Sequence, residues 1–345
     1  MASPIAIASI MKGQAALVTG AGSGIGRGLA LELAGRGVAV TIADINPESA
    51  AQVAAEIEAL GGQAASVACD VADSSQQLAA FRLHMQRFGR LDYALLNAGV
   101  GNTFDAIWGP MDSWQKTISI NLTAVVEGVR MATRCMVAGS PDAEAPPPAG
   151  DGARSSTGSD STAGGTGGVI LVVSSLAGVY PLSTGPAYSS TKAAALQLVR
   201  CFAQPLMAQG VRIAALCPSM TLTPMVEKWQ KDEPEVVAAL MASAPGNRML
   251  TVAEITKAGM TLLTDSSKVG SVLVVYQNGS WLEPRTEFSP VAMDGEARGG
   301  GTKAAALPTA QQQATHDSVP PTGCCLPFFR RCPRVANDPH STRIG

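Results

Sequence analysis

The chain has 345 residues, of which 46% are hydrophobic and 15% are charged, and its formal net charge is −2 at pH 7. This length allows one large domain or two small ones, and the apolar share is sufficient for a packed core. The balanced charge offers no basic face for a run of phosphates, so we expect a small-molecule partner and no nucleic acid.

Residues 1–11 form an N-terminal extension without the basic start or the sustained apolar core of a secretion signal. No later stretch has the apolar length of a bilayer span, so we expect a cytoplasmic protein. Four cysteines stand singly in apolar segments, which predicts reduced thiols in the core: Cys69, Cys135, Cys201 and Cys217. No metal-site spacing occurs, so we predict no metal.

Residues 12–283 alternate short β-branched runs with Ala-rich helical stretches. The runs are AALVTG, VAVTIAD, AASVACD, YALLNAG, VILVVSS, VRIAALCP and VLVVY. Such alternation is typical of a parallel sheet that is covered by helices on both faces. We predict an α/β fold, a single doubly wound Rossmann domain with a mostly parallel sheet of seven strands.

A glycine-rich turn follows the first predicted strand and precedes the helical stretch 27–34. Glycines in such a turn let the backbone approach a pyrophosphate, whose charge meets the free N–H groups of the helix start. Glycine also marks ordinary turns, but the strand before and the helix after favour a dinucleotide site. The predicted cofactor-binding residues here are Gly20, Ser23, Gly24, Ile25 and Gly26.

Asp44 stands at the end of the second predicted strand. A carboxylate there accepts both ribose hydroxyls of the adenosine half and repels the additional phosphate of NADP. Neither Ser23 nor Ile45 supplies the cation that a 2′-phosphate requires, so NAD is the predicted cofactor. A second interpretation is that Asp44 caps the helix beginning near Pro47, and the two roles are compatible.

Residues 139–168 break the alternation, because Gly, Ser, Pro, Ala and Asp replace the periodic apolar residues. This composition predicts a disordered insertion. It lies between a helix ending near Val137 and a strand starting at Val169, so we expect it at the edge of the sheet opposite the carboxyl ends of the strands. Ligands bind at those carboxyl ends, so the insertion should spare catalysis.

Tyr188 and Lys192 follow the strand VILVVSS and lie four residues apart on an evident helix, so they share one face. A free tyrosine has a pKa near 10, and lowering that pKa by about three pH units requires about 4 kcal/mol. One ammonium at roughly 4 Å supplies about that much in an effective dielectric near 20. The pair therefore suits general acid–base catalysis, although such a pair also occurs by chance on ordinary helices.

Residues 284–345 form a polar tail without helical or strand period, for which we predict disorder. The tail contains CCLPFFRRCPR, with Cys324, Cys325 and Cys332 beside Phe and Arg residues. S-acylation together with basic residues would tether such a segment to a membrane surface, and an unmodified tail is the favoured alternative.

A serine hydrolase is a poor fit, because it needs a nucleophile elbow and a histidine base. Ser175 does not stand in such an elbow, and two of the three histidines, His316 and His340, lie in the tail. His84 lies in a predicted helix, where we expect it on a solvated face.

The ordered set of motifs across about 12–276 resembles the short-chain dehydrogenase/reductase family. The matching residues are Thr19-Gly20-x-x-x-Gly24-x-Gly26, Asp70-Val71, Asn97-Ala98-Gly99, Asn121, Ser175, Tyr188-x-x-x-Lys192, and Pro218 with Thr223. The resemblance implies an oxidoreductase that transfers a hydride between NAD(H) and a secondary alcohol or ketone. It also implies a homodimer or homotetramer that assembles through the helices at about 112–137 and 187–208.

The resemblance assigns four catalytic residues. Ser175 is expected to hydrogen-bond the substrate oxygen, and Tyr188 to transfer its proton. Lys192 is expected to lower the tyrosine pKa and to hold the nicotinamide ribose. Asn121 is expected to hold the water that relays the proton to solvent.

The resemblance also assigns cofactor contacts beyond the glycine-rich turn. Asp70 and Val71 are expected at the adenine, and Pro218 and Thr223 at the nicotinamide. The cofactor is further expected to be lined by Asn97, Ala98 and Gly99. One residue departs from the family pattern, since Ser219 follows Pro218 where the family has Gly, which tolerates a crowded backbone.

The motif SSLAG, the downstream Tyr-x-x-x-Lys and Asp44 are similar to the NAD-dependent 15-hydroxyprostaglandin dehydrogenase type. Where the family places its substrate lid, residues 220–245 contain Met220, Met225, Trp229 and Met241. This suggests an apolar substrate such as a hydroxysteroid or a fatty or eicosanoid-like alcohol, although Met and Trp at helical spacing more often serve packing.

The alternative function is a non-catalytic NAD-binding protein that acts as a regulatory or interaction switch. The presence of Asn121, Ser175, Tyr188 and Lys192 together argues against it, since binding alone does not require all four.

Overall fold

The computed structural model describes residues 11–101, 113–144, 167–243 and 248–283. These ranges belong to one unit of the chain, Met1–Thr286, and the other unit, Glu287–Gly345, lies outside them. The predicted tail with Cys324, Cys325 and Cys332 is therefore outside the described residues, as are residues 1–10 of the predicted N-terminal extension.

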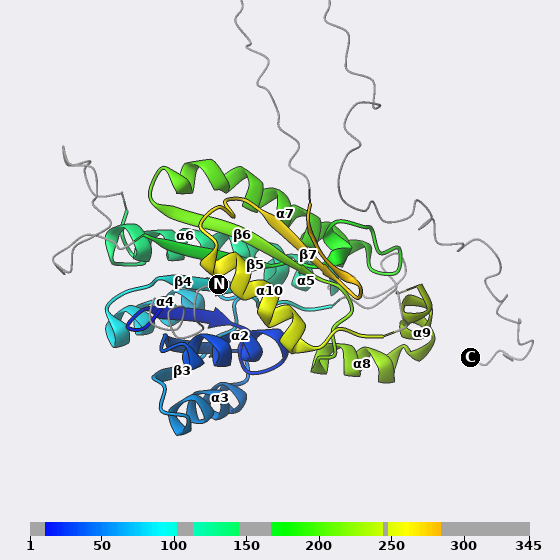
Figure 1. Cartoon of the computed structure of the whole chain (residues 1–345), viewed down its shortest axis with the longest axis horizontal. Coiled ribbons are helices and arrows are strands. Elements are labelled where there is room, and N and C mark those ends of the chain that lie inside the picture. Colours follow the sequence, from blue (N-terminus) through cyan, green and yellow to red (C-terminus); the bar gives the residue numbers. More distant parts are fainter. Residues whose placement is uncertain (1–10, 102–112, 145–166, 244–247, 284–345) are drawn as a thin grey trace, which may run out of the picture. The chain divides into compact units, whose positions relative to one another are not determined.

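Within the described residues, eight strands form one sheet in the order β3-β2-β1-β4-β5-β6-β7-β8 (Figure 1). The strands are β1 (Ala15–Thr19), β2 (Ala39–Asp44), β3 (Ala64–Ala68), β4 (Tyr93–Leu96), β5 (Gly168–Val173), β6 (Val211–Pro218), β7 (Val272–Tyr276) and β8 (Gly279–Leu282). The pairings from β3 through β7 are all parallel, which confirms the predicted mostly parallel sheet.

The predicted number of seven strands is wrong by one, because β8 pairs antiparallel with β7 through a two-residue turn at Gln277 and Asn278. Strand β8 has the sequence GSWL and is largely exposed, so it lacks the apolar run that marks the other strands. A tight hairpin needs only turn residues between two short strands, which is a weak signal in a chain dominated by parallel strands.

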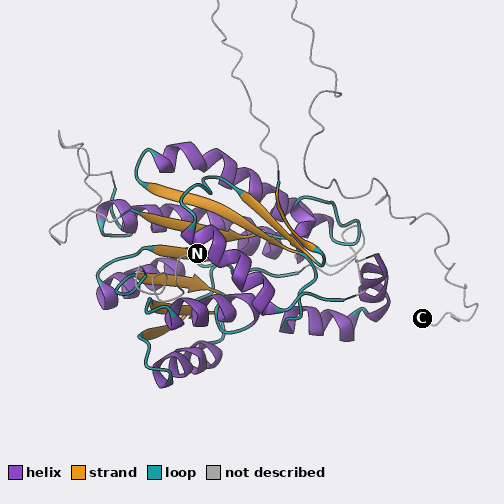
Figure 2. Ribbon diagram, in the orientation of Figure 1, coloured by secondary structure: helices purple, strands orange, loops and turns teal. Residues whose placement is uncertain are grey.

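Helices cover both faces of the sheet (Figure 2). The helices are α2 (Gly24–Gly35), α3 (Pro47–Ala59), α4 (Ser74–Phe88), α5 (Ser113–Ile118), α6 (Ala124–Ala138), α7 (Pro186–Met207), α8 (Pro224–Asp232), α9 (Pro234–Ser243) and α10 (Val252–Thr264). Alternate residues of β1 enter different core clusters: Leu17 packs with the cluster under α4, α6 and α7, whereas Ala16 and Val18 pack with the one under α2, α3 and α10. Burial on both faces explains why the strands are continuous apolar runs.

The order of the strands places the ligand-binding edge. The chain moves outward from β1 through β2 to β3, then returns to the other side of β1 with β4 and continues outward through β7. In such open sheets ligands bind at the carboxyl ends of the strands where the direction reverses. The ligand site is therefore expected at the carboxyl ends of β1, β4 and β5.

The predicted insertion, residues 139–168, lies between α6 and the start of β5. Helix α6 ends at the left-handed Gly139, and β5 starts at Gly168, so the segment adjoins the amino end of β5. Asp142 forms an ion pair with Arg82 of α4, at 2.6 Å between oxygen and nitrogen. Residues 145–166 lie outside the described residues, so disorder there stays a prediction.

Two expectations about single residues are wrong. His84 is fully buried rather than solvated, because α4 turns it toward the sheet on the same face as Ala80 and Phe81. Its ring nitrogens contact Thr41 Oγ1 at 2.8 Å and the carbonyl oxygen of Arg90 at 2.9 Å, and burial lowers the pKa of His84 to about 4. Cys201 is exposed on α7, whereas the other three singly placed cysteines are buried as predicted.

Across the described part of the chain, every helix is too short or too polar to cross a membrane.

Candidate active site

The glycine-rich turn lies between β1 and α2, and some of its glycine positions have no room for a side chain. Gly20 and Gly24 have φ angles of 62° and 53°, in the left-handed region that favours glycine. A Cβ atom at Gly26 would lie 2.2 Å from the carbonyl oxygen of Gly20. Ser23 occupies the N-cap position of α2, but its side chain caps no backbone N–H there. The turn and the uncapped helix start have the geometry that a pyrophosphate requires, and the contact itself stays a prediction.

Asn97 and Thr19 tie the ends of β1 and β4 together. The Asn97 side-chain nitrogen donates to the carbonyl oxygens of Thr19 and Gly20, both at 3.0 Å. The backbone N–H groups of Asn97 and Ala98 donate to Thr19 Oγ1, both at 3.1 Å. The Asn97 side chain therefore fixes the start of the glycine-rich turn, and its predicted contact with the cofactor stays a prediction.

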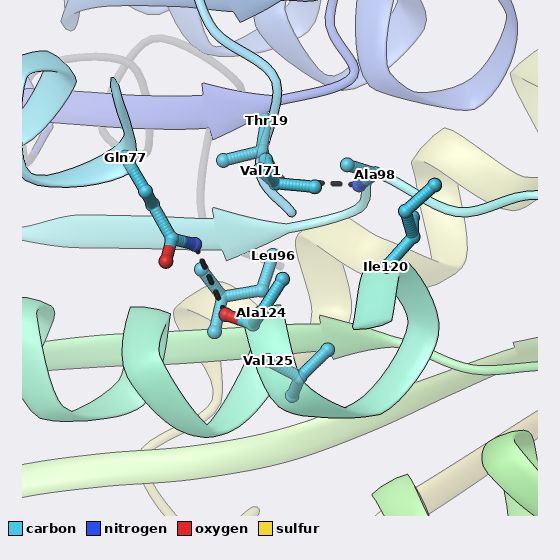
Figure 3. Close-up of a pocket in the computed structure, with 8 residues that line it drawn as sticks. All are labelled: Thr19, Val71, Gln77, Leu96, Ala98, Ile120, Ala124 and Val125. Carbon is cyan, nitrogen blue, oxygen red and sulfur yellow. Dashed lines mark hydrogen bonds between the residues drawn. The ribbon is translucent and has the colours of Figure 1, made fainter. Parts of the chain in front are cut away.

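A small pocket beside this tie brings Val71 and Ala98 together, as Figure 3 shows. Its floor includes Gln77, whose side-chain nitrogen donates to the carbonyl oxygen of Ala124 at 3.0 Å. The pocket holds about 10 Å³, roughly the space for one water molecule, so it is not itself a nucleotide site.

Asp44 lies beside the glycine-rich turn at the end of β2. Its two carboxylate oxygens accept hydrogen bonds from the backbone N–H groups of Gly22 at 2.8 Å and Asn46 at 2.9 Å. The interpretation that Asp44 caps the next helix is wrong, because Asn46 is the N-cap of α3 and accepts from Glu48 and Ser49. Asp44 therefore lies beside the glycine-rich turn, and its contact with the ribose stays a prediction.

Asp70 follows β3 at the same edge of the sheet. Its carboxylate accepts a hydrogen bond from the backbone N–H of Ala72 at 2.9 Å, and its own N–H donates to Gln76. This arrangement keeps the turn after β3 in place beside the buried Val71.

Tyr188 and Lys192 lie in the first two turns of α7. Lys192 is buried, and its Nζ donates to the carbonyl oxygen of Val173 at 3.0 Å. The same nitrogen lies 5.7 Å from the centre of the Tyr188 ring. A Cβ at Gly99 would come within 3.2 Å of Lys192 Nζ and 3.3 Å of Asn121 Oδ1, so Gly99 leaves the space in which these two side chains meet.

Asn121 stands in a π-helical turn, Ser119–Thr123, between α5 and α6. Its side chain exchanges two hydrogen bonds of 2.9 Å with the backbone N–H and carbonyl of Val100. Such turns often occur at functional sites, because they re-aim one side chain out of the helical period. The sequence did not predict the π-helix. The role of Asn121 in a proton relay remains a prediction.

Ser175 begins the short helix η2 (Leu176–Gly178), where its Oγ accepts from the backbone N–H of Ala177 at 3.1 Å. The preceding Ser174 is buried and donates to the carbonyl oxygen of Lys192 at 2.9 Å. Ser174 therefore fixes α7 against β5 next to the predicted catalytic lysine. We did not assign it a role from the sequence, although the Ser-Ser pair at the end of the strand was the available signal.

Burial has opposite effects on the pKa values of the Tyr–Lys pair. It raises the pKa of Tyr188, and a hydrogen bond with Ser175 lowers it only in part. Burial lowers the pKa of Lys192 to about 8. The Lys192 Nζ donates to the carbonyl oxygen of Val173, and the lowering of the tyrosine pKa that the resemblance implies for Lys192 stays a prediction. Tyr188 is thus protonated near neutral pH and suited to donate a proton.

Thr223 closes the site from the side of β6. Its Oγ1 accepts from Val226 N–H at 3.4 Å as the N-cap of α8, and a Cβ at Gly24 would lie 3.3 Å from its methyl group. The chain enters this loop through Pro218 and Ser219, where the Ser219 N–H still donates to Val275 at 2.9 Å. Serine in place of the family glycine therefore continues the pairing with β7.

Among the four lid residues, Trp229 of α8 packs edge-on against Tyr188, with ring centres 6.3 Å apart. Met225 is 39% exposed. Within the described ranges, no group of three or more His, Cys, Asp and Glu residues gathers in a way that could hold a metal ion.

A Rossmann sheet with a glycine-rich turn after β1 and a Tyr–Lys helix after β5 is the architecture of a nicotinamide-dependent dehydrogenase. The family model described as short chain dehydrogenase matches residues 14–142 and 156–234, well over half of the chain. The chain therefore belongs to the short-chain dehydrogenase family, and the resemblance seen in the sequence is confirmed.

Relatives are similar over most of the described chain. Human 15-hydroxyprostaglandin dehydrogenase (NAD(+)) is 33% identical over 227 residues, which cover 65% of this chain and 74% of the relative. Cyclohexanol dehydrogenase of Acinetobacter sp. (strain SE19) is 29% identical over 263 residues, which cover 75% and 92%. The predicted similarity to the 15-hydroxyprostaglandin dehydrogenase type is thus confirmed.

Solved structures share the fold. A 7 alpha-hydroxysteroid dehydrogenase, solved with NADH and 7-oxo glycochenodeoxycholic acid, superposes with a TM-score of 0.64 at 26% identity, covering 78% of this chain and 95% of that one. Levodione reductase superposes with a TM-score of 0.65 at 24% identity, covering 77% and 96%.

Proposed function

We propose that this short-chain dehydrogenase transfers a hydride between NAD(H) and an apolar secondary alcohol or ketone, with Tyr188 as general acid and base. The observation that carries the proposal is the convergence of four side chains from different elements. Ser175 follows β5, Tyr188 and Lys192 come from α7, and Asn121 comes from the π-helical turn. A protein that only bound the nucleotide would not need this set.

The cofactor is NAD(H). The human relative carries NAD(+) in its name, and the hydroxysteroid dehydrogenase was solved with NADH. In this chain the turn from Gly20 to Gly26 would hold the pyrophosphate, and the carboxylate of Asp44 beside it would take the adenosine ribose. When bound, NAD(H) accepts or supplies the hydride that the alcohol carbon loses or the carbonyl carbon gains.

The side chains of the protein handle the proton. In the reducing direction Tyr188, whose pKa burial raises, donates its proton to the carbonyl oxygen of the substrate as that oxygen becomes a hydroxyl. Ser175 already hydrogen-bonds with Tyr188, so its hydroxyl would hold the same oxygen. Lys192, whose Nζ lies 5.7 Å from the centre of the Tyr188 ring, would supply positive charge that stabilises the phenolate left when Tyr188 has given up its proton. In the oxidising direction Tyr188 must first lose its proton, and its phenolate oxygen then takes the hydroxyl proton of the alcohol as the carbon gives up its hydride.

An apolar substrate is supported by the side chains around the lid. Leu222 and Met225 are large apolar residues that remain 51% and 39% exposed at the start of α8, close to Thr223. Exposed apolar groups beside a polar catalytic centre are typical of pockets for apolar ligands. The named relatives act on a hydroxyprostaglandin and on cyclohexanol.

The test is a screen of hydroxysteroids, fatty alcohols and hydroxy-eicosanoids, with formation of NADH followed by absorbance. We expect the wild type to oxidise at least one class and Tyr188→Phe to lose nearly all turnover while still binding NAD. Tyr93→Phe is the matched control, because Tyr93 lies at the amino end of β4 and bonds to Gln14. If no alcohol separates wild type from Tyr188→Phe, the non-catalytic NAD-binding alternative is correct.

We also propose a cytoplasmic homodimer or homotetramer that assembles through α5, α6 and α7. Sedimentation of the purified chain would test the assembly. The tether through Cys324, Cys325 and Cys332 lies outside the described residues and stays a secondary prediction. Fractionation of cells expressing the chain with and without these cysteines would test it.

A further inference from the structure

Trp229 contacts both the catalytic tyrosine and the loop that follows β4. Its ring meets the Tyr188 ring at an interplanar angle of 80°, with centres 6.3 Å apart. The same ring also lies close to Gly101, where a Cβ would come within 2.1 Å of Trp229 Cζ2 and 2.9 Å of its Nε1. The indole therefore occupies space that exists only because residue 101 has no side chain.

The position of this indole is set from two sides. Val100, directly before Gly101, is held by both functional atoms of the Asn121 side chain. Helix α8, which carries Trp229, is anchored at its first turn by the Thr223 cap and by the buried Val226. The same helix that borders the glycine-rich turn thus presents an aromatic ring to Tyr188.

Any substrate of the proposed reaction must come close to this ring. Its oxygen has to approach Tyr188 and Ser175 within hydrogen-bonding distance, about 3 Å. Since the indole packs against Tyr188 itself, the carbon skeleton attached to that oxygen lies beside Trp229. An aromatic wall favours broad apolar skeletons, because contact area with a ring is large and its dispersion energy accumulates.

We propose that Trp229 is a specificity-determining residue that selects cyclic or extended apolar alcohols, and that the absence of a side chain at Gly101 sets the position of its indole. This inference rests on the proposed function and names the part of the site that chooses the substrate. Trp229 acts by contact with the substrate skeleton and takes no part in proton transfer.

The experiment compares cyclohexanol and a hydroxysteroid with 2-propanol, measuring kcat and KM for each with NAD. We expect Trp229→Leu to raise KM for the larger alcohols by about tenfold to a hundredfold, because it removes most of the apolar contact area, and to change 2-propanol by less than about threefold. Trp229→Phe, which keeps an aromatic wall, should restore most of the loss.

Gly101→Ala provides a test that leaves Trp229 in place. The backbone at Gly101 is open to L residues, so the added methyl acts by displacing the indole. It should shift substrate preference as Trp229→Leu does, and add nothing in a Trp229→Leu background. Gly35→Ala is the matched control, because a Cβ there meets nothing within 4 Å. Quenching of tryptophan fluorescence by cyclohexanone should weaken in Trp229→Phe.

The outcomes separate the two proposals. If the wild type oxidises an alcohol but Trp229→Leu lowers turnover of large and small alcohols equally, Trp229 is only structural and the inference fails. An unchanged preference in Gly101→Ala would also overturn it. If the wild type oxidises no alcohol at all, the proposed function fails first, and this inference fails with it.

Discussion

Replacing Lys192 by Met should stabilise the protein at neutral pH while abolishing its activity. Lys192 is buried, with 5% of its surface exposed, and burial lowers its pKa from 10.5 to about 8. The folded chain therefore carries a poorly solvated ammonium at pH 7. Met has a similar length and fills the same space without charge, so the substitution creates no large cavity.

The magnitude follows from the two pKa values. The difference between 10.5 in the unfolded chain and about 8 in the folded chain means that the unfolded chain binds the Lys192 proton more tightly by about 3 kcal/mol. At neutral pH this lowers the free energy of unfolding by the same amount. Because the pKa is lowered on folding, this destabilisation is fully present below about pH 8 and is relieved as the pH rises toward 10.5. The variant also loses the hydrogen bond to Val173, which is a largely pH-independent cost of about 1.5–3 kcal/mol.

The assay is urea unfolding followed by tryptophan fluorescence at pH 7 and pH 10. We expect the free energy of unfolding of Lys192→Met, relative to wild type, to fall by about 2.5 kcal/mol between these two pH values. Lys257→Met is the control, because Lys257 is exposed on α10 and its substitution should give the same difference at both pH values. A Lys192→Met difference that does not change with pH would refute the reasoning.

Three further substitutions test other parts of the structure. Asp44→Ala should raise the affinity for NADP relative to NAD by at least about tenfold, because it removes both a ribose acceptor and a repelling charge. Fluorescence titration with each cofactor measures this ratio. Equal affinity of the wild type for both cofactors would contradict the role assigned to Asp44. Between pH 7 and pH 4.5 the free energy of unfolding should fall by about 2 kcal/mol less in His84→Gln than in wild type. The pKa of His84 is lowered to about 4 in the folded chain, so the unfolded chain takes up the proton first as the pH falls and is stabilised by it. Parallel pH dependence of the two proteins would count against it. Replacing residues 145–166 by a short Gly/Ser bridge should leave kcat/KM unchanged, because the flanking residues adjoin the amino end of β5; a large loss in a folded protein would place the segment at the site.

The candidate catalytic residues can be picked out from the sequence because the chemistry proposed for them is tied to short-range spacing. Tyr188 and Lys192 share a helix face at a four-residue interval, and the glycines after β1 are required by a turn of fixed geometry. The alternation of runs likewise predicted the parallel sheet. These signals are local, so one sequence carries them.

What the sequence did not predict depends on tertiary contacts. The burial of His84 follows from which face of α4 meets the sheet, and the polar residues on that face obscure the pattern. The pKa of Tyr188 is raised chiefly by burial, which depends on how the surrounding elements pack around its ring. The contact between Gly101 and Trp229 joins residues far apart in the chain, and no local sequence pattern at either residue predicts it.

The hydrogen bonds in the site also limit which roles each side chain can take. The Lys192 ammonium has three donors and gives one to Val173, so it keeps donors for a ribose hydroxyl. Ser175 Oγ accepts from Ala177 and retains its own hydrogen for another oxygen. Asn121 directs its two amide hydrogens to Val100 and Thr191, so toward a relay water it can act only as an acceptor through Oδ1. A relay water held by this side chain would therefore donate a hydrogen bond to Oδ1, which also accepts from the Val100 N–H, and the backbone of Val100 holds the amide in that orientation.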